Sequence, residues 1–478
     1  MNISLNIDSG DTEHRSRDVS AQTRINLYPE RQPYSGAASE WILTCAPGTK
    51  PYLLIGSGDI RGLYKAGNGS LYVVKGRHVY EINDRSGEMT VYQRGDLLSD
   101  ASPVKMTDNG THLAIVDGMD LYLHALGSTD DIYTITKPFA APTHIVFIGG
   151  RLVCNATSGS NEDRNKVWYS DVYNAESWGA LNFFSAEAFS DPVIALAVRL
   201  GDLCVFGSDS FEIFALTGNA YNPFSRIGSA MIGIGCSAPY SVTTISDSVV
   251  FLGGSKGGEN MVYVLNGYNV SPISDHTIIT RLSDTKTAIG WSYAYEGHMF
   301  YVLRSGNTDT WCYDLTTAKW HRRRGLNNDY SPCAWKALYS ESFNGKNVVG
   351  FLGSDYLCEI SGDALTDADG KQIIRTYRSN NVLYQGKRLK HKALLVLIDS
   401  GHNAVYGSDA IAMMRFSDDG GYSWSRSFWQ SFGQKALYNK ALRWSSLGSS
   451  RERVFEIQIS DVAYFSIIGA FVDVDIGI

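Results

Sequence analysis

One short motif in the sequence has the residue types and spacing of a recognised chemical site. Ser417, Asp419, Gly421 and Trp424 fit the pattern Ser-x-Asp-x-Gly-x-x-Trp, the Asp-box, which occurs in several copies in sialidases. The pattern describes a hairpin turn in which the Asp and Ser side chains accept hydrogen bonds from nearby backbone N–H groups and the Trp packs inward. Because a single box is present, we predict a structural Asp-box that reinforces a turn. A carbohydrate-binding or sialidase-like protein is the alternative.

Two further motifs lack the parts that their chemistry needs. Residues 367–370 resemble the middle of a calcium loop, but Leu365 and Thr376 stand where the first ligand and the bidentate carboxylate belong. Residues 233–238 loosely follow a dinucleotide fingerprint, but Pro239 comes next and no helix is expected there. We therefore predict a solvated turn at 367–370, no catalytic residues, no cofactor, no metal ligands and a protein that is not an enzyme.

Two basic clusters occur in an otherwise acidic chain, at residues 321–324 and 387–392. Such clusters could dock an acidic partner or touch DNA phosphates. More often they form a solvated face or loop, and we favour that interpretation for both. The loop at 321–324 is also a candidate contact element, as is a polar insertion at residues 158–166.

The composition is typical of a β-rich protein. The 478 residues include 28 Tyr, 19 Phe, 10 Trp and 47 Gly but only 12 Pro. Aromatic residues suit half-buried pleated surfaces, and Gly supplies turns between short strands. The net charge of −7 argues against a protein that reads DNA sequence, because such proteins usually carry a basic stripe.

The cysteines and the apolar segments indicate a cytoplasmic site of synthesis. The seven cysteines are scattered and form no Cys-x-x-Cys pair, so we expect buried free thiols and assembly in a reducing cytoplasm. No signal peptide is visible at the start of the sequence, and no apolar stretch is long enough to span a bilayer. We therefore expect no membrane insertion.

One unit recurs through most of the chain: an apolar strand, a short polar turn and a second strand with aromatic residues. Seven copies begin at residues 71, 113, 152, 203, 249, 299 and 348. This spacing suits four-stranded propeller blades of about 40 to 50 residues. Apolar segments upstream of the copies, such as residues 192–197, are candidates for the inner strand of each blade. We predict a β-propeller of seven blades, or six if the irregular third copy is not one, against an array of unrelated hairpins.

The pattern on either side of the repeats differs. From residue 366 onward longer strands alternate apolar and polar residues, which predicts strands with one wet face and a C-terminal β-sandwich over 366–478. Residues 1–58 lack the repeat and contain several prolines, so we predict an extended N-terminal arm that clasps the propeller or a neighbouring subunit. The propeller is then expected over 59–365, and the fold class is all-β.

Residues 191–218, DPVIALAVRLGDLCVFGSDSFEIFALTG, resemble the central block of the packaged-DNA stabilisation proteins. These proteins form the tail hub, or nozzle, of short-tailed enterobacterial phages. Pro47-Gly48-Thr49 leading to Arg61-Gly62-Leu63-Tyr64 is similar too, and so is the strand pair from Tyr72 to Tyr80 with Gly76 between. The likeness runs from about residue 45 to the C-terminus.

The resemblance implies a structural protein of the virion tail, assembled in the cytoplasm of the bacterial host. It implies a homo-oligomeric ring, commonly a hexamer, below the portal and head-to-tail adaptor. Such a ring holds packaged DNA, contacts tailspikes or tail fibres and the tail needle, and surrounds the channel for genome ejection. Genomic DNA passes through that channel without sequence-specific binding. No catalytic residues are implied.

Overall fold

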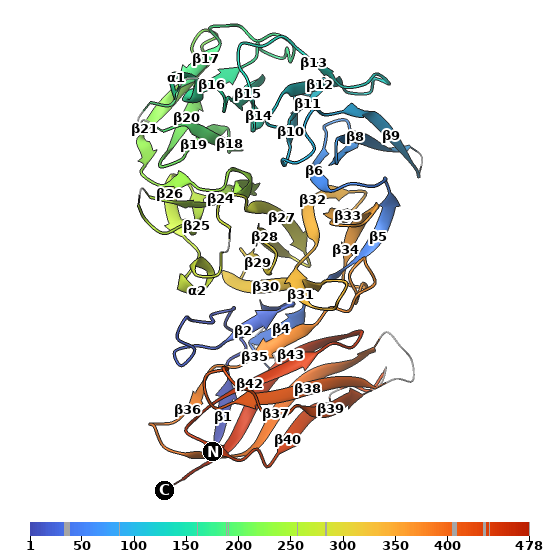
Figure 1. Cartoon of the computed structure of the whole chain (residues 1–478), viewed down its shortest axis with the longest axis vertical. Coiled ribbons are helices and arrows are strands. Elements are labelled where there is room, and N and C mark those ends of the chain that lie inside the picture. Colours follow the sequence, from blue (N-terminus) through green and yellow to red (C-terminus); the bar gives the residue numbers. More distant parts are fainter. Residues whose placement is uncertain are drawn as a thin grey trace.

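The protein is described by a computed structural model over residues 1–32, 39–85, 87–159, 161–187, 189, 191–255, 257–282, 284–403, 409–433, 436–438 and 440–477. Its regular structure is almost entirely strand. The helices in these ranges are α1 (Asn161–Arg164), α2 (His276–Ile279) and the 3-10 turn η1 (Pro239–Ser241). The strands form a β-propeller and, beside it, a β-sandwich (Figure 1).

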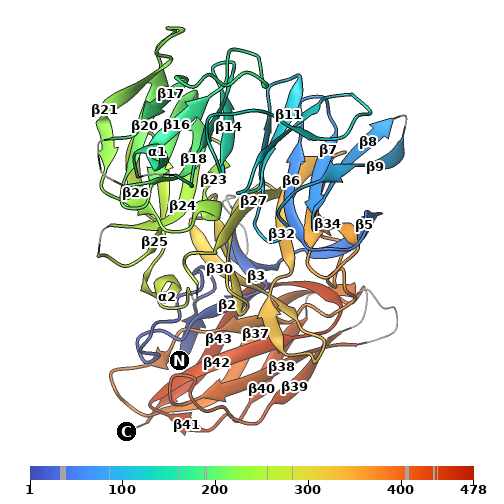
Figure 2. The ribbon, with the colours of Figure 1, turned by 45° about the horizontal axis from the view of Figure 1, so that its top comes forward.

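The propeller has seven blades, each built on four antiparallel strands (Figures 1 and 2). From the axis outward, the first four blades are β6 (Ile60–Lys65), β7 (Leu71–Lys75), β8 (His78–Arg85) and β9 (Glu88–Asp96); β10 (Lys105–Asp108), β11 (His112–Val116), β12 (Leu121–Ala125) and β13 (Tyr133–Thr134); β14 (Ile145–Ile148), β15 (Arg151–Asn155), β16 (Lys166–Tyr169) and β17 (Phe183–Ser185); and β18 (Val193–Arg199), β19 (Asp202–Gly207), β20 (Phe211–Leu216) and β21 (Phe224–Ile232).

The last three blades follow the same order. They are β23 (Thr243–Ile245), β24 (Ser248–Gly254), β25 (Met261–Asn266) and β26 (Asn269–Pro272), with β22 (Gly235–Cys236) also on β24; β27 (Ile289–Tyr295), β28 (His298–Ser305), β29 (Asp309–Asp314) and β30 (Lys319–Leu326), with β31 (Pro332–Ala334) on β30; and β32 (Ala337–Phe343), β33 (Lys346–Phe351), β34 (Tyr356–Ser361) and β5 (Gly48–Leu54). The inner strands of neighbouring blades contact one another around the axis, and β32 meets β6 to close the circle.

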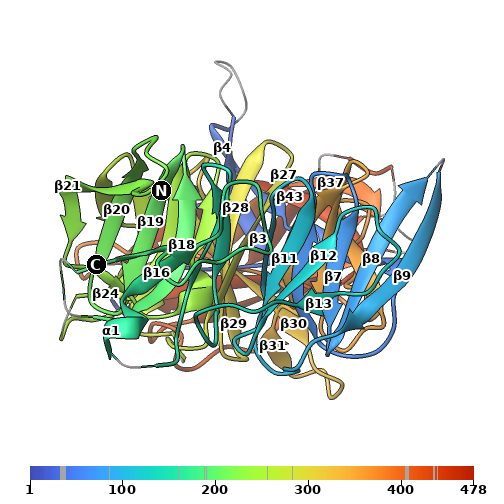
Figure 3. The same ribbon diagram turned by 90° about the horizontal axis from the view of Figure 1, so that it is seen from above.

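The repeat found in the sequence corresponds to the second and third strands of every blade, and the predicted propeller is confirmed with seven blades. The apolar segment at residues 192–197 leads into β18, the inner strand of blade four. Strands such as β7 and β15 are buried along their whole length, because each blade packs between two others. That burial explains why these strands are apolar at successive positions instead of at alternate ones. Figure 3 shows the strands along their length.

The sequence predicts that residues 1–58 form an extended arm that clasps the propeller or a neighbouring subunit; this segment does contact the propeller, but as a strand of its sheet and not as an arm. Residues 48–54 form β5, the outermost strand of blade seven, which pairs with β34 from Gly48↔Ser361 to Leu54↔Tyr356. The chain therefore closes the propeller with a strand from before the first blade. Pro51 in this strand is tolerated because β5 is an edge strand, whose missing N–H breaks no ladder. The same proline makes the segment look unlike a strand in the sequence.

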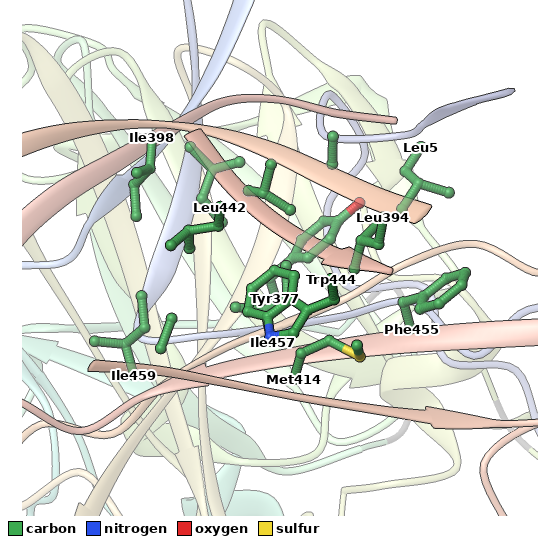
Figure 4. Close-up of a cluster of buried hydrophobic side chains, with 14 of the residues drawn as sticks. Leu5, Tyr377, Leu394, Ile398, Met414, Leu442, Trp444, Phe455, Ile457 and Ile459 are labelled. Carbon is green, nitrogen blue, oxygen red and sulfur yellow. The ribbon is translucent and has the colours of Figure 1, made fainter. Parts of the chain in front are cut away.

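The remaining N-terminal strands belong to the sandwich, whose two sheets enclose one apolar core (Figure 4). The first sheet has the order β3 (Leu27–Arg31), β4 (Trp41–Cys45), β43 (Ala463–Ile476), β37 (Leu389–Asn403) and β40 (Ala441–Ser445), with β1 (Asn2–Leu5) on β43 and β41 (Ser449–Ser450) on β37. The second has β2 (Thr23–Ile25), β35 (Arg375–Arg378), β42 (Glu452–Ile459), β38 (Ala410–Ser417) and β39 (Phe428–Gly433), with β36 (Val382–Leu383) on β42.

The second sheet of the sandwich is continuous with blade six of the propeller. Strand β2 lies between them: it pairs antiparallel with β35 and parallel with β30 at Ile25↔Arg322. Asn26 extends the junction, because its side-chain amide donates to the carbonyls of Arg324 (3.0 Å) and Ile374 (2.8 Å). The propeller and the sandwich are therefore joined by backbone pairing through β2, and not only by a connecting segment.

Candidate assembly surfaces

The first basic cluster, residues 321–324, lies on β30 at the junction with the sandwich and is not the solvated loop predicted from the sequence. His321, Arg322 and Arg323 are each at most 2% exposed. The Arg323 guanidinium stacks 3.9 Å from the ring centroid of Trp335 and donates to the carbonyl of Pro47 at 2.7 Å. Burial, together with the neighbouring Arg323, lowers the pKa of His321 to about 3. These three residues of the cluster are structural, while Arg324 is partly exposed and pairs with Asp309.

Arg322 is held by carboxylates that come from the N-terminal segment. Its Nε donates to Asp11 Oδ2 at 2.7 Å, and its Nη2 donates to Glu13 Oε2 at 3.0 Å. Both acids are almost completely buried. Asp11 also accepts the backbone N–H of Arg24 at 3.0 Å, which fixes the segment against β2. A buried charge is tolerated only when it is paired and hydrogen-bonded, and each of these groups meets that condition.

Glu13 is the point at which three parts of the molecule meet. Its carboxylate lies 2.9 Å from Arg281 of the propeller, 3.6 Å from Arg378 of the sandwich and 3.4 Å from Arg17 of its own segment. Burial raises the pKa of Glu13, but the guanidinium groups of Arg322, Arg281 and Arg378 outweigh it, so the net shift is downward. The N-terminal segment thus bridges the two bodies electrostatically.

The ion pairs continue across the outer face of the second sandwich sheet. Glu456 on β42 accepts from Arg378 on β35 at 2.7 Å and from Arg415 on β38 at 2.7 Å. Trp424 lies over this group, with its ring centroid 4.9 Å from Arg378 and 4.6 Å from Arg415. Contrary to the prediction, Trp424 does not pack inward: it is only partly buried and covers charged side chains on an outer face.

The four Asp-box residues lie together at the end of β38, where Ser417 is the last residue of the strand and the other three lie in the connection to β39. The Ser417 hydroxyl accepts the N–H of Gly421 at 2.7 Å and donates to Asp419 at 2.6 Å. Asp419 also accepts the N–H groups of Tyr422 (3.0 Å) and Ser423 (2.9 Å). These hydrogen bonds, first of all from Ser417 and Ser423, hold the pKa of Asp419 below its ordinary range.

The geometry of the box gives little support to glycan chemistry. Both oxygens of Asp419 are engaged within the turn, and the Trp424 ring is placed over two guanidinium groups. The N-terminal segment covers the turn from outside, where Arg17 donates to the carbonyl of Gly421 at 2.8 Å. The box therefore anchors the N-terminal segment to the sandwich.

The calcium-like segment is also structural, and Asp367 is not solvated as predicted. Its carboxylate is 5% exposed, accepts from Thr49 at 3.1 Å and lies 3.3 Å from Trp335 Nε1. Burial raises the pKa of Asp367. The turn therefore holds β5 in place as the outermost strand of blade seven. In the described part of the chain, no group of three or more His, Cys, Asp and Glu side chains could hold a metal ion.

A cavity of about 430 Å³ occupies the axis of the propeller and is lined by residues from all seven inner strands. Its ionisable groups include Lys105, His144 and Glu341. Burial raises the pKa of Glu341 to about 7 and lowers that of Lys105 to about 8. Burial, with Lys105 nearby, lowers the pKa of His144 to about 3, and its Nε2 lies 3.1 Å from the carbonyl of Pro239.

The second basic cluster is the one that reaches the surface. Lys387, Arg388, Lys390 and Lys392 are exposed at the start of β37, while His391 is buried. Lys392 pairs with Asp475 at 2.7 Å. The insertion at 158–166 carries α1 and lies on blade three; residue 160 is outside the described residues. None of the helices in the described ranges is long and apolar enough to cross a membrane.

Sequence reasoning missed the two acids at the junction. Asp11 and Glu13 are ordinary residues in a polar stretch, and their partners lie about 300 residues away in the chain. The Asp-box, by contrast, could be found from the sequence because its contacts fall within seven residues.

Two family models match the chain. The model described as "Bacteriophage P22 Gp10, beta-propeller" matches residues 3–350, and the model described as "Bacteriophage P22 Gp10, beta-sandwich" matches residues 378–475. The match therefore starts well before residue 45, where the sequence resemblance was placed. No curated protein matches the chain.

Several solved propellers are similar at low identity. The N-terminal domain of Nup159 is 13% identical, with a TM-score of 0.43, over 70% of this chain and 98% of that one. The WD40 domain of Pan2 from Neurospora crassa is 10% identical, with a TM-score of 0.39, over 63% and 89%. The WD40 propeller domain of Doa1 is 11% identical, with a TM-score of 0.40, over 66% and 96%.

Proposed function

The chain belongs to the family of bacteriophage P22 Gp10, which makes it a structural protein of the phage tail, and from this membership we propose that it is the tail hub, or nozzle. In this proposal several copies, six in the simplest case, form a ring below the portal and head-to-tail adaptor. The ring retains packaged DNA, carries tailspikes or tail fibres and the needle, and leaves a channel for ejection.

The observation that carries the proposal is the presence of both family models, in order, on a single chain. The way the two bodies are joined supports it. A hub must transmit force between the proteins that it connects. Here the propeller and the sandwich share a sheet through β2 and are linked by buried ion pairs through Glu13. A rigid part with separate faces can dock an adaptor, a needle and spikes at once.

The net charge supports a channel that does not grip DNA. The chain carries a formal charge of −7. A ring of such subunits presents a wall of net negative charge, which repels phosphates and keeps DNA mobile during ejection. DNA is then retained by the closed end of the channel and not by binding to the wall.

The test uses phage that lack this protein. We expect such particles to package DNA and then lose it, which the DNA content of purified heads measures over time. Adding the protein to freshly packaged heads should stop the loss. If heads without the protein kept their DNA and the particles adsorbed to host cells normally, the hub assignment would be wrong.

A further inference from the structure

Blades three and four present an unusually apolar surface at one end of their strands. The turns there expose six large apolar residues: Val172, Tyr173, Leu181, Leu200, Leu216 and Tyr221. Tyr221 is 95% exposed, Leu181 85% and Tyr173 68%. We call these six residues the turn face of blades three and four. Single exposed apolar residues are normal, but a group of this size marks an interaction site.

Val172, Tyr173 and Leu216 lie around one turn, and the connections that carry Leu181, Leu200 and Tyr221 are at the same end of the strands of these two blades. The two-glycine turn at 149–150 lies between these side chains. A Cβ atom added to Gly149 would lie 2.6 Å from the side chain of Leu216, and one added to Gly150 would lie 3.1 Å from the ring of Tyr173. Arg151 donates to the carbonyl of Ala220 at 3.2 Å, which fixes the loop that carries Tyr221 beside this turn.

The turn face is bordered by carboxylates that have no cationic partner. Asp171 accepts from Ser177 at 2.6 Å, Glu176 from the hydroxyl of Tyr133 at 2.6 Å, and Asp202 from the hydroxyl of Tyr268 at 3.1 Å. Within the described ranges no Lys or Arg forms an ion pair with Asp171, Glu176 or Asp202. An apolar centre with an acidic border fits a partner surface with basic residues at its edge.

The chain itself carries such a surface at the far end of the sandwich. Lys387, Arg388 and Lys390 are exposed there, and no described carboxylate forms an ion pair with any of them. Exposed Leu383 and Ile476 accompany them. We call Lys387, Arg388 and Lys390 the basic end of the sandwich. It adjoins the C-terminus, because Leu389 pairs with Ile476.

The two bodies differ in charge, and the cations of the sandwich are concentrated in its C-terminal part. Residues 48–365, the propeller, contain 24 Lys and Arg against 32 Asp and Glu, a net −8. Residues 1–47 and 366–478 together contain 18 against 17, a net +1, whereas residues 366–478 alone contain 14 against 11, a net +3. Blades three and four lie in the upper part of Figure 1, and the C-terminus lies at the bottom. Because the two surfaces are at opposite ends of one molecule, they can meet only between copies.

We propose that the turn face of blades three and four binds the basic end of the sandwich of a second copy of this chain. The contact joins two different surfaces, so it is heterologous, and repeating it head to tail builds a closed ring if the rotation closes. Tyr221 and Tyr173 supply the aromatic anchors, and the unpaired acids and bases fix the register. This inference rests on the proposed hub function and names the contact that makes its ring.

The first experiment swaps the charges and measures incorporation of the protein into phage particles. The base-reversed variant carries Lys387→Glu, Arg388→Glu and Lys390→Glu, and the acid-reversed variant carries Asp171→Lys, Glu176→Lys and Asp202→Lys. We expect each variant alone to reduce incorporation about tenfold or more. A protein that carries both sets of substitutions should be incorporated normally, because the two surfaces then again have opposite charges. A control reverses three exposed cations elsewhere: Arg15, Lys65 and Lys286 to Glu.

The outcomes separate this inference from the proposed function. If the unaltered protein were absent from the tail, the hub function itself would fail. If the protein were present but the reversed variants incorporated normally, or if the combined variant remained excluded while its melting curve matched the unaltered protein, the contact proposed here would be wrong. In the last case the two surfaces would belong to other tail proteins.

A second experiment tests contact directly. All seven cysteines are buried, so cysteines placed on the surface would be the reactive thiols. Val172→Cys with Lys387→Cys should cross-link copies in the tail through a short bifunctional maleimide, while Met119→Cys with Lys387→Cys should not. Tyr221→Ala should reduce incorporation at least about tenfold, and Tyr330→Ala, a control 72% exposed, should not. Cross-linking of the Met119 pair alone would refute the arrangement.

Discussion

Replacing Glu13 by Gln should destabilise the protein strongly, because the Glu13 carboxylate is almost completely buried among guanidinium groups. The substitution keeps the shape but removes the charge that Arg322, Arg281, Arg378 and Arg17 surround. Breaking a buried ion pair by removing one partner costs about 3–5 kcal/mol, because the other charge stays buried without compensation. Arg322 keeps Asp11, so we expect the lower part of that range, about 3 kcal/mol.

The control is an ion pair of similar length on the surface. Arg31 and Glu40 lie 2.8 Å apart with both side chains more than 60% exposed. Glu40→Gln should therefore cost less than about 1 kcal/mol. Denaturant unfolding of both variants, followed by fluorescence and by hydrogen exchange, measures the difference. Exchange should increase first around Arg24, whose N–H is bonded to Asp11, and only later in blades two to four.

The effect of Glu13→Gln should depend on pH in a defined direction. The folded-state pKa of Glu13 lies below its ordinary value of 4.5, so the unfolded chain binds the proton more readily. The stabilisation is complete above 4.5 and is lost as the pH falls through the folded-state pKa. The gap between the unaltered protein and the variant should therefore be widest near pH 7 and shrink below 4.5. If Glu13→Gln cost no more than Glu40→Gln at pH 7, the junction would not be held by these ion pairs.

Four other predictions concern single features. Asp419→Ala should cost about 1 kcal/mol, measured by thermal unfolding, because it removes hydrogen bonds to N–H groups of an exposed turn that water can reach; no change would show that water replaces the carboxylate completely. Trp424→Ala should cost less than the 3–5 kcal/mol of a buried aromatic, because the ring is only partly buried. Glu341→Gln should raise the stability of the protein at pH 8 but not at pH 4. Burial raises the pKa of Glu341 to about 7, so its ionisation destabilises the folded protein as the pH rises. Equal gains at both pH values would show that burial of Glu341 does not have this effect. Deleting residues 1–58 should abolish cooperative unfolding, since it removes β5 from blade seven, whereas a free arm would leave the melting curve unchanged.

The blades could be predicted from the sequence because their signal is local. Each copy pairs strands a few residues apart, such as β19 with β20, and buries them on both faces, so the hydrophobic run and the turn spacing appear directly in the sequence. The Asp-box was identifiable for the same reason. The sandwich followed from alternation along its strands, although its N-terminal strands were missed.

The tertiary structure alone decided which segments complete each body. Whether Pro51 belongs to a strand depends on an edge position beside β34, about 300 residues later in the chain. Whether the basic residues at 321–324 are solvated depends on whether folding places β2, Asp11 and Glu13 beside them. A charged residue looks the same in the sequence whether it lies in a solvated loop or in a buried ion pair. Its contribution to the free energy of unfolding depends on the partners that folding brings within hydrogen-bonding distance.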